Sequence, residues 1–202
     1  SLPKIAIPKR NTTRNDHPSS PQVVDAPDSE VIEISLDGIF QFDWGIRGMD
    51  CPDCAMKASR AVNRLPGIQS CRISVAEGTV EISQDISDGA VSRASSVLTS
   101  LGHEPDIGWM RAVGANPERI ALSLGVDNRG LRNSILSIPG TLDARIDKGH
   151  IDVQQVWISD PKLRAASEQK MSEVLGEGHR LSPVIESGFR KDQIQLLAAV
   201  LT

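Results

Sequence analysis

Residues 48–54 read Gly-Met-Asp-Cys-Pro-Asp-Cys and contain two of the three cysteines in the chain. Two residues separate Cys51 from Cys54, and a carboxylate, Asp50, immediately precedes the first thiol. Two thiols and an acid this close together have two common uses in proteins. They bind a soft or borderline metal ion, or they carry out thiol–disulfide exchange.

In the segments around this loop, the spacing of apolar residues alternates between that of a strand and that of a helix. Apolar residues alternate over residues 40–46, which predicts a half-buried strand that leads directly into the loop. Apolar residues recur at spacings of three and four over residues 55–65 and predict a helix, which Pro66 and Gly67 end. We expect two further strands over 71–75 and 80–82, a second helix over 90–101 and a fourth strand over 103–110. This order, β-α-β-β-α-β, is the ferredoxin-like arrangement.

The same landmarks then repeat further along the chain. Residues 125–127 correspond to residues 48–50, and Ile-Pro-Gly at 138–140 corresponds to Leu-Pro-Gly at 65–67. Alternating apolar residues over 120–126 predict the first strand of this second unit. The offset between matching landmarks changes little, which indicates a divergent internal repeat.

The second unit lacks the thiols of the first. The positions that correspond to Cys51 and Cys54 are Asn128 and Leu131. His179 corresponds to His103, but without thiol partners it is assigned no metal. We therefore expect the second unit to keep the fold without a metal site.

The sequence thus predicts an α+β fold of two tandem ferredoxin-like βαββαβ domains behind a flexible N-terminal tail. The expected divisions are a tail at 1–35, a first domain at 36–111, a linker at 112–118, a cysteine-free second domain at 119–186, and the start of a helix at 187–202 that leads to a membrane domain. The proline-rich, polar tail cannot repay its ordering entropy. The final apolar run is shorter than the ~20 residues that cross a bilayer, so we do not expect the fragment itself to span one.

Composition excludes some functions. The formal net charge is −4, and aromatic residues make up 3% of the 202 residues with no Tyr, which argues against a nucleic-acid partner. Three cysteines do not form a disulfide framework, and we see no secretory signal. We therefore expect a soluble fragment in a reducing compartment.

The cysteine motif in its strand–loop–helix context, followed by Leu-Pro-Gly-Ile at 65–68 and a Gly-Thr-Val-Glu-Ile strand at 78–82, resembles the heavy-metal-associated domain. That ferredoxin-like module occurs in copper chaperones, mercury-binding proteins and the cytosolic N-terminal regions of heavy-metal P-type ATPases. Residues 39–110 carry the resemblance, and residues 119–186 look like a degenerate copy. An acid before the first cysteine resembles the zinc, cadmium and lead ATPases, whereas copper members usually carry Thr there. The resemblance implies that Asp50, Cys51 and Cys54 hold the metal.

Coordination chemistry favours the same assignment. Two thiolates can satisfy Cu(I), whereas Zn(II) normally takes four ligands and accepts carboxylate oxygen beside sulfur. Asp50 would be the third donor, and a fourth position would stay open for handover or accept His103, although a surface turn histidine is the favoured interpretation of His103. Three anionic donors also leave a smaller net negative charge with Zn(II) than with Cu(I). We therefore favour Zn(II), with Cd(II) or Pb(II) as alternatives and Cu(I) as less favoured.

Other residues near the motif have simpler expected roles. A helix N-terminus lowers the pKa of thiols, which predicts that the thiols of this cluster ionise readily. Lys57 could offset residual negative charge. Asp53 is expected to be a solvated loop charge, Met49 to pack beneath the loop, and Cys71 to be a small buried hydrophobe.

The implied function is that of the cytosolic N-terminal zinc-binding region of a P-type ATPase that exports Zn(II). This region would capture the ion and deliver it or regulate the pump from the cytoplasmic side of a membrane, with the metal ion and the other domains of the parent ATPase as partners. The fragment carries no nucleotide-binding loop of the Gly-rich Lys-Ser/Thr type, so it is not catalytic alone. The alternatives that stay open are a free-standing metallochaperone or metal sensor and, as a third, a thiol oxidoreductase. Asp50 could instead be only a cap for the helix that follows.

Overall fold

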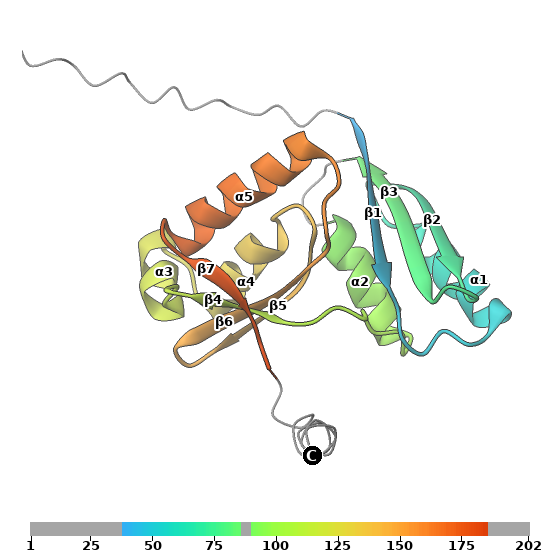
Figure 1. The fold of residues 1–202 in the computed structure, drawn as a ribbon, viewed down its shortest axis with the longest axis horizontal. Coiled ribbons are helices and arrows are strands. Elements are labelled where there is room, and N and C mark those ends of the chain that lie inside the picture. The colour runs from blue at the N-terminus through green and yellow to red at the C-terminus, as the bar shows by residue number, and fades with distance from the viewer. Residues whose placement is uncertain (1–37, 86–89, 186–202) are drawn as a thin grey trace, which may run out of the picture. The chain divides into compact units, whose positions relative to one another are not determined.

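The computed structural model describes residues 38–85 and 90–185 (Figure 1). The tail predicted at 1–35 and the helix start predicted at 187–202 lie outside the described residues. Within the described ranges, no helix combines the length and the apolar character needed to cross a membrane.

The first half of the described chain has the predicted order of strand, helix, two strands and helix (Figure 1). Its antiparallel sheet has the order β1-β3-β2, and the helices are α1 and α2. The bounds are β1 Ile39–Gly45, α1 Pro52–Val62, β2 Ile68–Ser74, β3 Thr79–Asp85 and α2 Ala90–Ser100. The loop between β1 and α1 is therefore the cysteine loop, as the sequence predicts.

The fourth strand expected over 103–110 is reduced to a single bridge between Ile46 and Pro105. On either side of this bridge, the Arg47 amide donates to the Glu104 carbonyl at 2.8 Å and the Asp106 amide donates to the Gly45 carbonyl at 2.7 Å. Pro105 has a fixed φ and Gly108 follows soon after; both residue types weaken a strand. The next regular strand, β4 (Met110–Val113), belongs to the second sheet.

The second half forms a four-stranded antiparallel sheet with the order β5-β6-β4-β7. In chain order its strands occupy the second, third, first and fourth places, which is the ferredoxin-like topology. Its remaining elements are α3 Pro117–Leu124, α4 Asn128–Leu136, β5 Thr141–Asp147, β6 His150–Gln155, α5 Pro161–Leu175 and β7 Arg180–Pro183. The predicted fold class is confirmed, with α3 as an additional helix.

The strand predicted over 120–126 is wrong, because residues 120–124 lie in α3 and Gly125 ends that helix. The Asn116 side chain caps the helix by accepting a hydrogen bond from the Arg119 amide at 2.9 Å, and Pro117 occupies the first turn. Gly125 ends the helix with a φ of 65°. The first strand of the second unit is β4 instead, so the expected linker at 112–118 contains the end of β4 and the start of α3.

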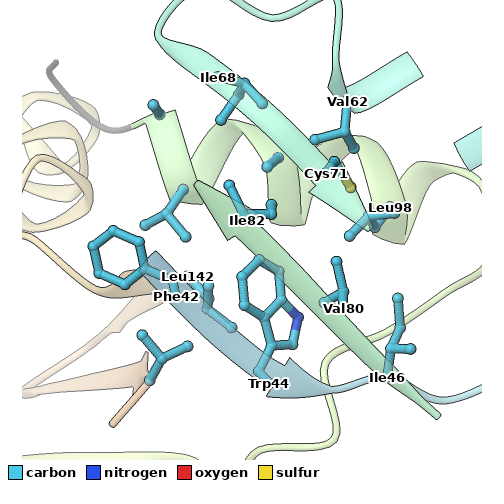
Figure 2. Close-up of a cluster of buried hydrophobic side chains, with 14 of the residues drawn as sticks. Phe42, Trp44, Ile46, Val62, Ile68, Cys71, Val80, Ile82, Leu98 and Leu142 are labelled. Carbon is cyan, nitrogen blue, oxygen red and sulfur yellow. The ribbon is translucent and has the colours of Figure 1, made fainter. Parts of the chain in front are cut away.

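Two clusters of buried apolar side chains form the cores. The first, shown in part in Figure 2, contains Phe42, Trp44 and Ile82 from the first sheet. Four side chains of the second half belong to the same cluster: Leu142, Val156, Ile158 and Leu163. The second cluster is built from the second half and contains Leu131, Ile135 and Val153. The strand that leads to the cysteine loop is therefore anchored in a core to which both halves contribute.

Candidate metal centre

The cysteine loop passes directly into α1, and Cys51 is the N-cap residue of that helix. Its backbone is extended, with φ −125° and ψ 121°, and its Sγ accepts a hydrogen bond from the Cys54 amide at 3.4 Å. Pro52 occupies the first turn, where its fixed φ suits a helix and its missing N–H costs nothing. The motif thus places both thiols at the N-terminal end of α1, which carries a partial positive charge.

The two thiols share a hydrogen bond and do not ionise alike. The hydrogen bond from the Cys54 side chain, together with that from the Cys54 amide, lowers the pKa of the Cys51 thiol. The same side-chain hydrogen bond raises the pKa of Cys54, because Cys54 is the donor in the pair. The lowered pKa expected from the helix N-terminus is therefore found for Cys51 and is wrong for Cys54. Cys51 is the thiol that forms the first thiolate.

We expect iodoacetamide to modify the three cysteines in a fixed order near neutral pH. A thiol with a lowered pKa is a thiolate at lower pH, so Cys51 should react before Cys54. Burial raises the pKa of Cys71 to about 11, so Cys71 should react last. Peptide mass spectrometry of the reduced protein after timed quenching measures the order. In guanidinium chloride the three rates should converge, and faster labelling of Cys54 or Cys71 in the native protein would contradict the site described here.

Asp50 does not join the two thiols in a preformed three-ligand set. In the part of the chain that the structure describes, no three His, Cys, Asp or Glu side chains form a group that could hold a metal ion. Asp50 is exposed. The pKa of Cys54 is raised mainly by its hydrogen bond with Cys51 and by burial, and the charge of Asp50 raises it by a smaller amount. Asp50 therefore lies within electrostatic range of Cys54, and its carboxylate faces solvent.

His103 is not the surface turn histidine that we expected. Only 8% of the residue is exposed, and its Nδ1 lies 2.9 Å from the carbonyl oxygen of Gly48, at the start of the cysteine loop. It too belongs to no three-ligand group among the described residues. The structure therefore brings His103 to the backbone of the loop.

The remaining residues near the motif follow their expected roles. Met49 is 6% exposed and packs in the core beneath the loop. Cys71 is 5% exposed, as expected of a small buried hydrophobe. Asp53 is exposed, as expected, but it lies in the first turn of α1 and not in the loop. Sequence reasoning missed Gly48, whose φ is 74° and whose carbonyl anchors the loop. The sequence feature that could have pointed to this role is the glycine directly before Met-Asp-Cys, since glycine readily adopts a positive φ.

The corresponding place in the second half has no donor set. Asp127 caps α4 there, and its carboxylate accepts a hydrogen bond from the Gly130 amide at 2.7 Å. Leu131, at the position of Cys54, is fully buried in the second core. The second half has thus kept the capped helix start and filled the thiol position with a core side chain.

Residues 45–102 match the family model of the heavy-metal-associated domain. The matched segment starts at the last residue of β1, ends just after α2, and includes both thiols of the loop. This segment of the chain is therefore similar to the heavy-metal-associated domain.

Three solved structures illustrate what the chain is similar to. The water-soluble region of the P-type ATPase CopA from Bacillus subtilis is 18% identical with a TM-score of 0.41, and the match covers 74% of this chain and 93% of that one. A solution structure of the N-terminal soluble domains of the same CopA is 16% identical, with a TM-score of 0.38 and coverage of 74% and 97%. A CopZ metallochaperone is 26% identical, with a TM-score of 0.31 and coverage of 32% and 97%. TM-scores below 0.5 do not by themselves define a shared function or metal. A search of curated protein sequences found no match.

Proposed function

We propose that the domain at 45–102 binds one thiophilic metal ion through Cys51 and Cys54, and that Asp50 turns in to complete the donor set for Zn(II). Cd(II) and Pb(II) suit the same donors. The observation that carries the proposal is the placement of both thiols at the N-terminus of α1, where the Cys51 Sγ accepts a hydrogen bond from the Cys54 amide. Such a pair can bind a metal through two sulfur atoms once both thiols have lost their protons.

The charges around the pair support binding of a cation followed by its release. Both thiols are partly exposed, and the exposed carboxylates of Asp50 and Asp53 flank the first thiol. Lys57 is among the charges that lower the pKa of Cys54, which favours its thiolate form. Three protein donors leave one position of a tetrahedral zinc site open, and a partner ligand can enter there.

We further propose that the chain is the N-terminal region of a heavy-metal P-type ATPase that exports the ion, where the domain delivers metal to the pump or regulates it. The resemblance of the Gly-Met-Asp-Cys motif to the zinc, cadmium and lead ATPases supports this assignment. The alternative is a free-standing metallochaperone or sensor. The complete reading frame tests the proposal: membrane helices and an aspartyl-phosphate motif after Thr202 support the ATPase, and a stop codon there contradicts it.

Cu(I) is a second candidate ion, and a specific observation favours it. The only donors that lie together at the loop, among the residues that the structure describes, are two thiols, and two thiolates satisfy Cu(I). The match to the heavy-metal-associated domain does not distinguish Zn(II) from Cu(I). The behaviour of Asp50 therefore decides between the two ions.

We expect Asp50→Ala to weaken Zn(II) binding at least about tenfold, equivalent to ~1.4 kcal/mol, because zinc loses an oxygen ligand. Cu(I) binding should stay within about twofold, because both thiols remain. Competition titrations of the reduced protein with chromophoric chelators measure both constants. Asp53→Ala is the matched control, since Asp53 is also an exposed carboxylate beside the same thiols. If Asp50→Ala leaves Zn(II) binding at the level of Asp53→Ala, Asp50 is no ligand and the copper assignment replaces the zinc one.

A further inference from the structure

The turn that follows α2 meets the start of the cysteine loop at two points. His103 Nδ1 lies 2.9 Å from the Gly48 carbonyl oxygen, and the His103 side chain is buried. At the second point, a Cβ placed on Gly48 would lie 2.9 Å from the carbonyl oxygen of Gly102. Gly48 also has a φ of 74°, which residues other than glycine rarely adopt. The first residue of the Gly-Met-Asp-Cys motif is therefore held against this turn by a close backbone approach and by an imidazole.

The chemistry of the contact defines the tautomer of His103. A carbonyl oxygen only accepts hydrogen bonds, so Nδ1 must carry the proton and donate it to Gly48. Nδ1 is thereby occupied by the loop backbone. Loss of this donor would leave the Gly48 carbonyl without its imidazole partner.

The second half provides an internal comparison. Gly114, which directly follows the first strand of this half, lies near the turn before β7 but less closely, since a Cβ placed on it would lie 3.6 Å from the Gly178 carbonyl oxygen, an ordinary contact. His179 stands where His103 stands in the first half, but its Nδ1 contacts the carbonyl of Gly176 in its own turn, at 2.8 Å. The close backbone approach seen at Gly48 is therefore looser at Gly114. A hydrogen bond from the histidine to the loop between strand and helix is found in the first half, which carries the thiols, where His103 contacts Gly48. In the second half, His179 contacts Gly176 in its own turn instead.

We propose that His103 is a positioning residue for the metal site: its Nδ1–H holds the Gly48 carbonyl, and this fixes the backbone that presents Asp50 and Cys51 at the start of α1. His103 acts through the loop and is not the fourth ligand. The inference rests on the proposed metal binding at Cys51 and Cys54. It parallels the general role of hydrogen bonds outside the ligand set, which orient the ligands and affect metal affinity.

Three substitutions of His103 in the full chain separate positioning from ligation. The amide nitrogen of Asn lies the same number of bonds from Cα as Nδ1, so His103→Asn can still donate to Gly48. His103→Gln places its amide nitrogen at the distance of Nε2 instead, and His103→Ala has no donor. Amides are not among the usual zinc ligands, so all three variants lose imidazole ligation equally.

We expect the Zn(II) affinity of His103→Asn to stay within about threefold of the wild type, and that of His103→Gln and His103→Ala to fall roughly tenfold to a hundredfold. His179→Ala is the matched control and should bind Zn(II) like the wild type. Equal losses in all three His103 variants would show ligation and overturn the proposal. Wild-type affinity in all three would overturn it as well.

A second measurement does not need metal or substitution. The long-range ¹H–¹⁵N spectrum of the His103 imidazole in the metal-free wild type should show a protonated Nδ1 and a bare Nε2. The opposite tautomer would overturn the proposal even if a variant fails to fold. Absence of Zn(II) binding by the wild type would instead count against the metal-binding function, while the tautomer would still report on the contact with Gly48.

Discussion

Cys51→Ser/Cys54→Ser should abolish metal binding while the domain stays folded. Both sulfur donors are gone, and serine hydroxyls do not replace thiolates for Zn(II), Cd(II) or Cu(I). We expect affinity to fall at least about a hundredfold, equivalent to ~2.7 kcal/mol, for each ion. The fold should survive, because Cys51 is the N-cap of α1 and serine is among the best N-cap residues.

The control for this double variant is Cys71→Ala, which removes the third thiol. Cys71 is buried in the core, away from solvent, so its loss should cost some stability and leave metal affinity unchanged. Isothermal titration with Cd(II) under reducing conditions, together with far-UV circular dichroism, measures binding and fold on the same samples. Full binding by the double variant would mean that the metal lies elsewhere in the chain.

Phe42→Ala should have the largest effect on stability. Phe42 lies on β1, opposite Ile82 of β3, and both side chains are fully buried in the core shown in Figure 2. Truncation of a buried aromatic ring removes apolar burial and leaves a cavity, which costs about 3–5 kcal/mol. Because β1 leads into the cysteine loop, this loss should also make the loop less ordered.

Urea denaturation followed by circular dichroism measures the change, with Ile39→Ala as the matched control on the same strand. Ile39 is 67% exposed, so its truncation should change the free energy of unfolding by no more than about 0.5 kcal/mol. A loss below ~1 kcal/mol for Phe42→Ala would contradict the described packing of β1.

The sequence predicted the first five elements of the first half well because their local signals agree with one another, whereas the strand expected over 103–110 is only a single bridge. Alternating apolar residues, a proline at the helix start and Pro66-Gly67 after the helix all indicate the same elements, and the structure contains them. The position of the thiols at a helix N-terminus followed directly from this order. The α+β class and the ferredoxin-like topology were therefore accessible from local patterns alone.

The second half was predicted less accurately because the apolar residues of one segment fit the spacing of a strand although the segment forms a helix. Apolar residues at 120, 122 and 124 alternate as in a strand, yet in α3 Leu122 is 83% exposed and contributes nothing to the core. The Asn116-Pro117 pair was a helix-start signal that outweighs this alternation. The first strand, β4, is only four residues long and carries little pattern of its own.

Two features of the site depend on contacts that local patterns do not encode. The hydrogen bond between the thiols raises the pKa of Cys54 against the trend of the helix N-terminus, and it requires the side-chain geometry. His103 meets Gly48 across 55 positions of sequence, and only the folded turn reveals that its imidazole is buried. Composition and spacing therefore identified the candidate metal ligands. The hydrogen bonds that surround these residues became visible only in the tertiary structure.

X-ray absorption spectroscopy of the reduced, full chain loaded with one equivalent of metal would identify the donor atoms directly. For Zn(II), we expect two sulfur scatterers at about 2.3 Å, with the remaining ligands being oxygen or nitrogen at about 2.0–2.2 Å. Both sulfur scatterers should disappear in Cys51→Ser/Cys54→Ser. A shell of oxygen and nitrogen alone in the wild type would contradict the assignment of Cys51 and Cys54 as the metal site.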